Sequence, residues 1–427
     1  MMEPVRLTIE RLGQRGEGVA RLDGVTIFVP YALPGESVLA ELDRGHGRLV
    51  EIVTPSPERV AAFCRYFTLC GGCAVQTLAA RPYAEWKRGL VAHALQQAGV
   101  VAEVGPLVDG HGEGRRRATF HSRVTRGVQG RASAETGFMR ARAHEIIEIE
   151  DCPLLAPSMA GALGAARGLA AVLVALGRPL DIVVTATLGG LDIDLRGAGA
   201  LADDMRQSLI AAAERFDLAR LANHGETIIE RRTPLLEMGR AAVAPPPGAF
   251  LQATLAGEEQ LAAVVGAAVA GARCIVDLFA GIGTFALRLA DNAEVHAVDA
   301  DAAALASLDR AARAAFQLRP VTVERRDLFR RPLAGDDLAR FDAAVFDPPR
   351  AGAELQARAL AASNLATLAA VSCNAQTFAR DAAILANAGY RLESVTPIDQ
   401  FRHSQHVEIV GIFRWPAVRR RSRRLLG

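Results

Sequence analysis

The chain has 427 residues, of which 50% are hydrophobic and 22% charged, and its formal net charge at pH 7 is +2. This length exceeds what one hydrophobic core supports, so we expect two or three domains with the composition of an ordinary globular protein. Six cysteines are too few for a disulfide scaffold in so long a chain, which leaves metal binding or catalysis as their interpretation.

Positive charge in this sequence comes almost entirely from arginine, because Lys87 is the only lysine. Together with an excess of alanine, this bias is typical of GC-rich codons, although arginine also suits phosphate and base contacts in RNA. The first residues lack the basic-then-apolar pattern of a signal peptide. The most apolar stretch, residues 159–177, contains Arg167 and predicts a packed helix, not a membrane span. We therefore expect a cytoplasmic protein.

Short strand-like runs separated by turns with Gly and Pro fill the first part of the chain. They lie at residues 5–9, 18–22, 25–29 and 37–42. Regular short strands with such turns predict a small β-barrel of the oligonucleotide-binding kind. Over this stretch the sequence resembles a TRAM domain, which implies a role in RNA binding. Pro55 and Pro57 mark its end, so we expect the first domain over residues 1–57.

Residues 58–248 mix helical and strand-like patterns, which predicts an α+β domain. A hairpin is expected from residues 118–124 and 135–139 with a Gly-containing turn between them. Arginines surround this hairpin at positions 115, 116, 117, 123, 126, 131, 140 and 142. With few acidic neighbours, these arginines fit either RNA phosphate contacts or a solvated surface. The Pro- and Gly-rich residues 245–248 close the region.

From residue 249 onward, strand-like runs alternate with helical segments, which is the pattern of a doubly wound α/β domain. Buried strands are expected at residues 274–279, 294–299, 321–323, 341–346 and 368–372. Two last runs, at residues 391–398 and 407–413, would close the sheet as an antiparallel pair. This domain is assigned to residues 249–416, and the arginine-rich residues 417–427 form a basic tail.

A glycine-containing turn follows the first of these strands, at Gly281 and Gly283, and Asp299 ends the next strand. This spacing places a carboxylate where it can accept hydrogen bonds from ribose hydroxyls. Because the turn lacks the third glycine of a pyrophosphate site, S-adenosylmethionine fits it better than a dinucleotide. Asp327 and Asp347 end the next two strands, beside the adenine and the reacting centre. Any one of these Asp residues alone would be interpreted as a helix cap or turn residue.

The turn at Asp347, Pro348 and Pro349 is close to one found in enzymes that methylate exocyclic amines, which place an aromatic residue after the two prolines. Here Arg350 holds that position, and Cys373 follows the next strand. Methylation of an amine is therefore the weaker of two enzymatic interpretations.

Three segments resemble the catalytic signature of the RNA uracil-5-methyltransferase family: residues 347–352, 371–374 and 401–408. Residues 250–252 resemble a further family segment. Together with the TRAM-like start, the resemblance covers most of the chain.

This resemblance implies Cys373 as nucleophile and Glu408 as base. It also implies a shell of side chains around S-adenosylmethionine, namely Gln252, Phe279, Thr284, Asp299, Asp327 and Asp347. Two positions depart from the family pattern, because Arg402 stands where proline is common and Thr284 stands where asparagine is common.

The chemistry of uracil gives an independent reason to pair a thiol with a carboxylate. Uracil C5 is a poor nucleophile until a thiolate adds to C6, and a base must then remove the C5 proton. An unperturbed thiol has a pKa of about 8.5, so the site must favour the thiolate. Taken singly, Cys373 would be a small buried residue, as we interpret Cys274, and Glu408 a solvent-facing strand residue.

Four cysteines remain: Cys64, Cys70, Cys73 and Cys152. Four thiolates can hold either zinc or a [4Fe–4S] cluster, and spacing does not decide between them. The family resemblance implies the [4Fe–4S] cluster, because TRAM-containing members with this cysteine pattern carry one. Zinc and unligated cysteines stay as alternatives. The Cys-x3-Cys-x2-Cys motif of radical enzymes is absent, so a cluster here would serve structure or RNA recognition.

The leading hypothesis is an enzyme that makes 5-methyluridine in structured RNA with S-adenosylmethionine as cofactor. Ribosomal RNA of the large subunit (23S rRNA) is favoured as substrate over transfer RNA. The rival hypothesis is a non-catalytic RNA-binding protein that retains the fold, although a pure binder needs neither Cys373 nor Glu408. We expect a monomer, with neither DNA nor a membrane as partner.

Overall fold

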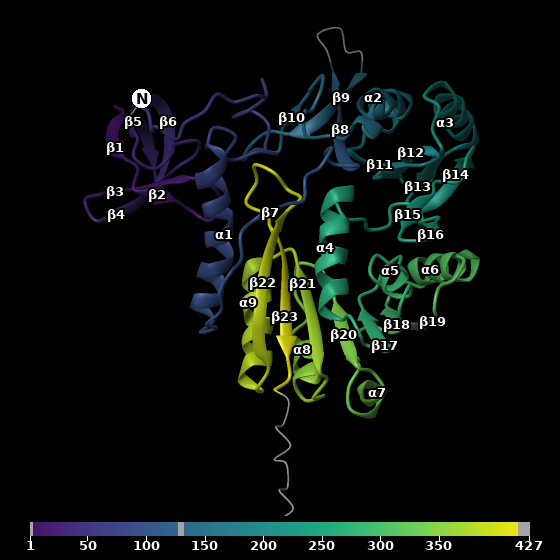
Figure 1. Ribbon diagram of the computed structural model, residues 1–427. Helices are drawn as coiled ribbons and strands as arrows, with labels where there is room; N and C mark the ends of the chain where they lie inside the picture. The colour runs from purple at the N-terminus through teal and green to yellow at the C-terminus, as the bar shows by residue number, and fades with distance from the viewer. Residues whose placement is uncertain (1–2, 127–131, 417–427) are drawn as a thin grey trace, which may run out of the picture.

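The computed structural model describes residues 3–126 and 132–416. Arg131 and the basic tail at residues 417–427 therefore lie outside the described residues. Three large sheets carry most of the chain, and each takes nearly all its strands from a different part of the sequence (Figure 1). No helix within the described ranges is long and apolar enough to cross a membrane.

The N-terminal sheet has six strands in the order β1-β5-β6-β4-β3-β2. Its strands are β1 (Val5–Thr8), β2 (Arg11–Leu12), β3 (Gly18–Leu22), β4 (Val25–Val29), β5 (Ser37–Asp43) and β6 (His46–Thr54). Ala20, Ile27 and Val38 belong to its small apolar core, because alternate residues of a strand face one side of a sheet. The sequence did not predict β6, since most of its residues are exposed or only partly buried.

The central region folds around a seven-stranded sheet in the order β10-β9-β8-β11-β12-β13-β14. Its strands are β8 (Arg117–Arg126), β9 (Ala132–Met139), β10 (Ile146–Ile147), β11 (Leu180–Thr187), β12 (Gly190–Arg196), β13 (Arg220–Asn223) and β14 (Glu226–Glu230). The predicted hairpin is present as the antiparallel pair β8 and β9. A separate hairpin follows, formed by β15 (Leu236–Met238) and β16 (Ala241–Val243).

Two helices pack on this central sheet, α2 (Ala162–Val172) and α3 (Asp203–Arg215). Short 3-10 turns, η1 (Pro157–Met159) and η2 (Val174–Leu176), flank α2. The apolar stretch predicted as a packed helix is therefore a helix between two tighter turns. Its side chains Ala165, Ala166 and Leu169 lie in the core beneath the sheet.

The C-terminal sheet has eight strands in the order β19-β18-β17-β20-β21-β23-β22-β7. They are β7 (Val108–Asp109), β17 (Cys274–Leu278), β18 (Glu294–Asp299), β19 (Val321–Arg325), β20 (Ala343–Phe346), β21 (Thr367–Ser372), β22 (Arg391–Asp399) and β23 (Glu408–Arg414). Strands β19, β18, β17, β20 and β21 run parallel, and β23 is antiparallel to both β21 and β22. The doubly wound sheet and its closing antiparallel pair match the sequence prediction.

Helices cover both faces of the C-terminal sheet (Figure 1). They are α4 (Leu255–Ala268), α5 (Ala286–Leu289), α6 (Ala302–Ala314), α7 (Asp336–Ala339), α8 (Glu354–Ala361) and α9 (Ala375–Asn387). Separate apolar clusters line the two faces, one containing Leu278 and Phe413 and the other containing Ile275 and Val410.

Helix α1 (Ala80–Gln97) joins the N-terminal barrel to the C-terminal sheet. Although it comes from the region that the sequence assigns to the central domain, it packs beside α9 (Figure 1), and its Val91 and Leu95 lie in the core of the C-terminal sheet. At its other end, the indole of Trp86 donates a 3.0 Å hydrogen bond to the carbonyl of Gly13 in the barrel. The α1 helix thus connects the barrel to the edge of the sheet described next.

Candidate active site

The carboxyl ends of the parallel strands meet at one edge of the C-terminal sheet, where ligands bind in folds of this kind. Asp299 ends β18, Asp347 follows β20 and Cys373 follows β21. Because β23 runs in the opposite direction, its first residue, Glu408, lies at this same edge. The register pairs Ser372 with Ile409, so the backbone positions of Cys373 and Glu408 are neighbours.

The turn after β17 lies at this edge of the sheet, and a hydrogen bond fixes its backbone. The amide of Gly281 donates a 2.9 Å hydrogen bond to the carboxylate of Asp299, and Phe279 adopts a positive φ of 64°. A Cβ atom at Gly281 would meet no atom within 4 Å, whereas one at Gly283 would lie 2.9 Å from Leu308. Gly281 therefore leaves backbone accessible to a ligand, and Gly283 permits close packing against α6.

The helix after this turn, α5, begins at Ala286. The amide of Ala286 donates a 2.9 Å hydrogen bond to the fully buried carboxylate of Asp277. Asp277 is a residue that the sequence analysis did not single out, and it fixes where the turn ends and the helix begins.

Asp327 and Thr284, two further residues of the predicted cofactor shell, take part in local hydrogen bonds. One carboxylate oxygen of Asp327 accepts a 3.0 Å hydrogen bond from the amide of Phe329, whose ring lies 5.4 Å from that of Phe279. The backbone carbonyl of Thr284 accepts a 2.8 Å hydrogen bond from Arg288. Phe279, Asp299 and Asp327 thus gather around the glycine turn.

Gln252 and Asp347, the two remaining residues of the predicted cofactor shell, contact each other. The amide nitrogen of Gln252 donates a 3.1 Å hydrogen bond to Asp347, and its amide oxygen accepts a 2.7 Å bond from Gln400. Gln252 and Gln400 are 2% and 0% exposed, so both amides are held in one orientation. Gln400 also interacts with Glu408, whose pKa it lowers. Two buried amides therefore link Asp347 to Glu408.

Burial favours the neutral forms of the three acidic groups at this edge. Burial raises the pKa of Cys373 to about 11, and Glu408 and Asp347 act in the same direction. Burial, followed by Asp347, raises the pKa of Glu408 to about 8, and burial raises the pKa of Asp347 to about 7. Arg350 lowers the pKa of both Cys373 and Glu408. A further cation bound here would therefore favour the thiolate and carboxylate.

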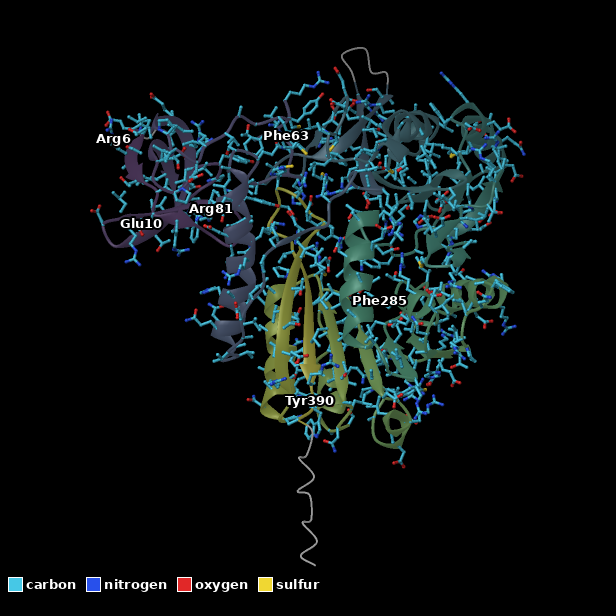
Figure 2. All side chains as sticks on the ribbon, in the orientation of Figure 1. Arg6, Glu10, Phe63, Arg81, Phe285 and Tyr390 are labelled. Carbon is cyan, nitrogen blue, oxygen red and sulfur yellow. The ribbon has the colours of Figure 1, made fainter. Side chains whose placement is uncertain are left out.

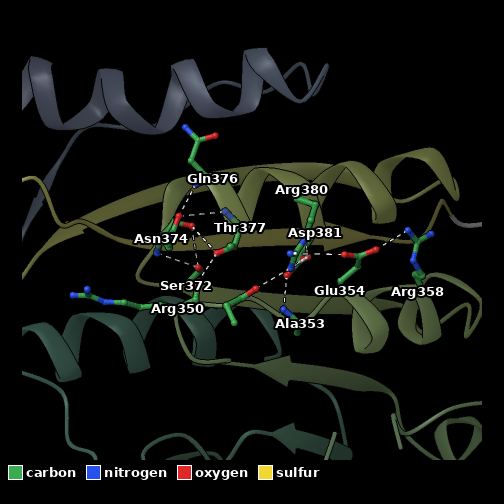
Figure 3. A network of polar contacts seen from close by, with 11 residues as sticks. Arg350, Ala353, Glu354, Arg358, Ser372, Asn374, Gln376, Thr377, Arg380 and Asp381 are labelled. Atoms are coloured by element: carbon green, nitrogen blue, oxygen red, sulfur yellow. Dashed lines mark hydrogen bonds and ion pairs between the residues drawn. The ribbon is translucent and has the colours of Figure 1, made fainter. Parts of the chain in front are cut away.

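A network of polar contacts fixes the segments on either side of Cys373 (Figure 3). Asn374 caps α9 through bonds of 2.9 and 3.3 Å from the amides of Gln376 and Thr377. The hydroxyl of Thr377 donates a 3.3 Å hydrogen bond to the carbonyl of Arg350. The turn that follows β20 is therefore tied to the first turn of α9, with the thiol between them.

Cys373 opens into a cavity of ≈ 220 Å³ that is also lined by Arg350, His406 and Arg15. Arg15 comes from the N-terminal barrel and also lines a second cavity of ≈ 870 Å³ between the barrel and α1. It lines a third cavity, of ≈ 410 Å³, which reaches Cys73. The exposed Arg15 thus lines all three cavities, and Cys373 lines one of them.

The remaining predicted cysteines, Cys64, Cys70, Cys73 and Cys152, line a single cavity of ≈ 490 Å³. Phe63, labelled in Figure 2, lines the same cavity. Burial raises the pKa of Cys73 to about 11, and Arg115 opposes this rise. Within residues 3–126 and 132–416, no three His, Cys, Asp or Glu side chains meet as closely as the ligands of a single metal ion.

Three residues near the thiol had no assigned role in the sequence analysis: Arg15, Lys87 and Gln400. Lys87 was noticed only as the single lysine of the chain. Arg15 lies in a Gly-rich turn of the barrel, and Gln400 follows β22. Neither has a local pattern that separates it from an ordinary surface residue. Their proximity to Cys373 and Glu408 comes from the packing of distant segments.

Two family models match the chain. One describes a TRAM domain and matches residues 3–49, and the other describes tRNA (Uracil-5-)-methyltransferase and matches residues 248–414. The 23S rRNA (uracil(1939)-C(5))-methyltransferase RlmD of Halomonas elongata is 32% identical over 446 residues, which cover 97% of this chain and 90% of that protein. This chain belongs to the RNA uracil-5-methyltransferase family. It is an enzyme, and the expected TRAM domain is confirmed.

Other relatives are more similar in sequence. An RNA methyltransferase of Brucella suis is 47% identical over 408 residues, covering 95% of this chain and 97% of that protein. Among solved structures, the tRNA (uracil-54, C5)-methyltransferase of Pyrococcus abyssi in complex with S-adenosyl-L-homocysteine matches with a TM-score of 0.71. It covers 96% of this chain and 99% of its own at 22% identity, which supports the fold of the whole chain.

Proposed function

We propose that this enzyme methylates C5 of a uridine in structured RNA, with Cys373 as nucleophile, Glu408 as base and S-adenosylmethionine as methyl donor. The observation that carries the proposal is the pairing of β21 with β23. This pairing sets a partly exposed thiol beside a buried carboxylate at the ligand-binding edge of the sheet. Few reactions other than methylation of a pyrimidine carbon need both groups.

The proposed reaction uses these two side chains in sequence. The thiolate of Cys373 forms a bond to C6, which moves the electrons of the C5–C6 double bond into an enolate so that C5 can attack a methyl group. The carboxylate of Glu408 then takes the proton from C5. The electron pair of that C–H bond restores the double bond, and the bond from C6 to the Cys373 sulfur breaks.

The glycine turn fits the adenosine part of the cofactor. Gly281 leaves open space at its Cα, and Asp299 presents its carboxylate beside this turn. The proposed shell consists of Gln252, Phe279, Thr284, Asp299, Asp327 and Asp347. S-adenosylmethionine supplies an electrophilic methyl group on a positively charged sulfur, and three acidic groups with raised pKa values suit a neighbouring positive charge.

The RNA would reach Cys373 by way of Arg15. Because Arg15 lines three cavities, one of which contains Cys373, the barrel would form one side of the path to the thiol. We assign RNA binding to the regions 1–57 and 58–248, and the chemistry to residues 249–416. The target base must leave its stack to enter a cavity of ≈ 220 Å³.

Large-subunit ribosomal RNA is the proposed substrate. Its support is the relative from Halomonas elongata, whose name assigns it to 23S rRNA and which aligns with nearly the whole chain at 32% identity. The structurally similar tRNA methyltransferase is only 22% identical, so its similarity supports the fold of this chain and not the choice of RNA.

Release of tritium from RNA labelled at uridine C5 tests this proposal. With S-adenosylmethionine, the purified enzyme should release tritium from large-subunit ribosomal RNA, because methylation replaces the C5 hydrogen. Transfer RNA with the same label serves as the comparison substrate. Release from transfer RNA alone would overturn the choice of RNA, and methyl incorporation without tritium release would indicate methylation of an amine. A pure RNA-binding protein would produce neither signal.

A [4Fe–4S] cluster held by Cys64, Cys70, Cys73 and Cys152 is part of the same proposal. Zinc would draw its thiolates to within about 4 Å of one another, since each Zn–S bond is ≈ 2.3 Å. A cluster is larger, so its thiolates surround a cavity, as these four do. In the part of the chain that the structure describes, the buried Nε of Arg115 has no hydrogen-bond partner. An anionic cluster of iron, sulfide and thiolates would attract this cation.

Enzyme purified without oxygen should therefore be brown, with broad visible absorbance and about four iron and four sulfide per chain. Cys70→Ser should lose most of the iron, because three thiolates hold a cluster poorly. Cys274→Ser is the matched control, since Cys274 lies in β17 away from this cavity, and it should keep the wild-type iron content. A colourless wild-type protein with one zinc per chain would contradict the cluster.

A further inference from the structure

Lys87 is the one lysine of the chain, and its side chain is 0% exposed. Long charged side chains are rarely buried completely, because removing an ammonium group from water is costly unless it is fully paired. Lys87 lies in α1, with Tyr83 one turn before it. Its burial therefore calls for a specific set of partners.

The ammonium group of Lys87 has three hydrogens, and three acceptors receive them. One is a carboxylate oxygen of Asp399 at 2.8 Å. The second is the carbonyl of Phe401 at 3.2 Å, and the third is the carbonyl of His406. All three belong to the end of β22 or to the segment that follows it. The charged form of Lys87 is thus fully satisfied by one short stretch of chain.

Tyr83 extends the same contact. Its hydroxyl donates a 2.5 Å hydrogen bond to the second carboxylate oxygen of Asp399 and accepts a 2.9 Å bond from the amide of His403. Two side chains of α1 therefore hold the backbone or side chain at positions 399, 401, 403 and 406. These positions span the loop of residues 400–407, which connects β22 with β23.

This loop delivers the groups that surround the thiol. Gln400, at its start, contacts Gln252 and Glu408, and His406, near its end, lines the cavity at Cys373. Glu408 is the first residue after the loop and pairs with Ile398 across the strands. Any change in the path of the loop would therefore move the carboxylate that must meet the C5 proton.

We propose that Lys87 is a positioning residue for Glu408: its ammonium group fixes the loop of residues 400–407 and so aims the carboxylate at the C5 proton. This inference rests on the proposed role of Glu408 as base. It gives α1 a part in the reaction, although α1 comes from a region that the sequence places outside the catalytic domain.

The charge of Lys87 acts in the same direction as its hydrogen bonds. Burial and Asp347 raise the pKa of Glu408, whereas Gln400, Arg350 and Lys87 lower it. Loss of the ammonium group would thus leave a carboxylic acid that gives up its proton less readily. Both effects of the loss would slow proton removal from C5.

The rate of proton removal separates this role from simple anchoring of α1. Lys87→Met would leave Asp399 buried with a single hydrogen-bond donor, which can impair folding. The test therefore also uses the double variant Lys87→Met with Asp399→Asn, which removes both charges of the pair. Arg88→Met is the matched control, because Arg88 is the next residue of α1 and donates a 2.7 Å hydrogen bond to the carbonyl of Val104, outside the loop.

Single-turnover experiments with methyl-labelled cofactor and RNA tritiated at C5 follow methyl transfer and proton removal separately. The double variant should transfer the methyl group within about twofold of the wild-type rate but release tritium roughly 10- to 100-fold more slowly. Enzyme covalently joined to RNA should accumulate as a result. Arg88→Met should show wild-type rates for both steps.

Tritium release at the wild-type rate in the double variant would overturn the positioning role, as would equal slowing of both steps together with weaker RNA binding. Glu408→Gln, measured in parallel, tests the assumption beneath it. If Glu408→Gln also releases tritium normally, the base itself is wrongly assigned. If only the Lys87 variant does so, Glu408 stays the base and Lys87 merely anchors α1.

Discussion

Glu408→Gln is expected to leave the enzyme covalently joined to methylated RNA. The amide cannot take the C5 proton, whereas Cys373 can still add to C6 and the methyl group can still move to C5. Loss of a general base should slow product release by roughly 10²- to 10⁴-fold. Denaturing gel electrophoresis with labelled RNA and cofactor should show a retarded band that disappears on protease treatment.

The structure favours this substitution as a clean test. Burial raises the pKa of Glu408 to about 8, so the neutral acid predominates in the free enzyme at pH 7, and a neutral amide of equal size resembles it. The fold should therefore tolerate the change. Glu393→Gln is the matched control, because Glu393 lies exposed in the neighbouring strand β22 and pairs with Arg391 and Arg414. Normal turnover by Glu408→Gln would show that another group removes the proton.

Local sequence patterns predicted much of the C-terminal sheet. Strands that are buried on both faces, such as β17 and β20, consist almost wholly of apolar residues, and this continuous run is visible without any knowledge of the fold. The glycine turn and Asp299 were also predictable from local patterns. The turn directly follows a buried strand, and Asp299 ends the next strand at a characteristic spacing. The roles proposed for Cys373 and Glu408 required the family resemblance as well.

Packing between segments that are distant in the sequence could not be predicted from local sequence patterns. Helix α1 alternates polar and apolar residues as many surface helices do, and nothing in it indicates that Val91 and Leu95 pack beneath the C-terminal sheet. Strand β7 is only two residues long and joins the far side of the same sheet. Both elements depend on contacts with residues that follow them by hundreds of positions.

Buried polar residues were missed for a related reason. Lysine is a residue of surfaces in most proteins, so Lys87 carries no sign of burial until Asp399 and the loop after it are placed around it. Gln400 likewise gains its role only from Gln252, which lies in a separate segment before α4. The groups proposed to orient Glu408 were therefore less visible in the sequence than Glu408 itself.

Cys373→Ala is expected to abolish methylation and to form no covalent complex with RNA. Removing a nucleophile that the other catalytic groups depend on lowers the rate by up to about 10⁶-fold, because those groups then have no intermediate on which to act. Cys373 is partly exposed and lines a cavity. Its truncation should thus cost little stability, and S-adenosyl-L-homocysteine should bind with wild-type affinity in calorimetry.

Cys274→Ala provides the comparison within the same sheet. Cys274 is also a partly buried cysteine, but it begins β17 at the edge opposite the glycine turn, packed against the core. Its loss should leave methylation unchanged. Combining Cys373→Ala with Glu408→Gln should remove the retarded band that Glu408→Gln alone produces, since only the sulfur of Cys373 is proposed to join the RNA. A covalent band that persists in the double variant would assign the bond to another residue, and substantial activity in Cys373→Ala would refute methylation through a thiol adduct.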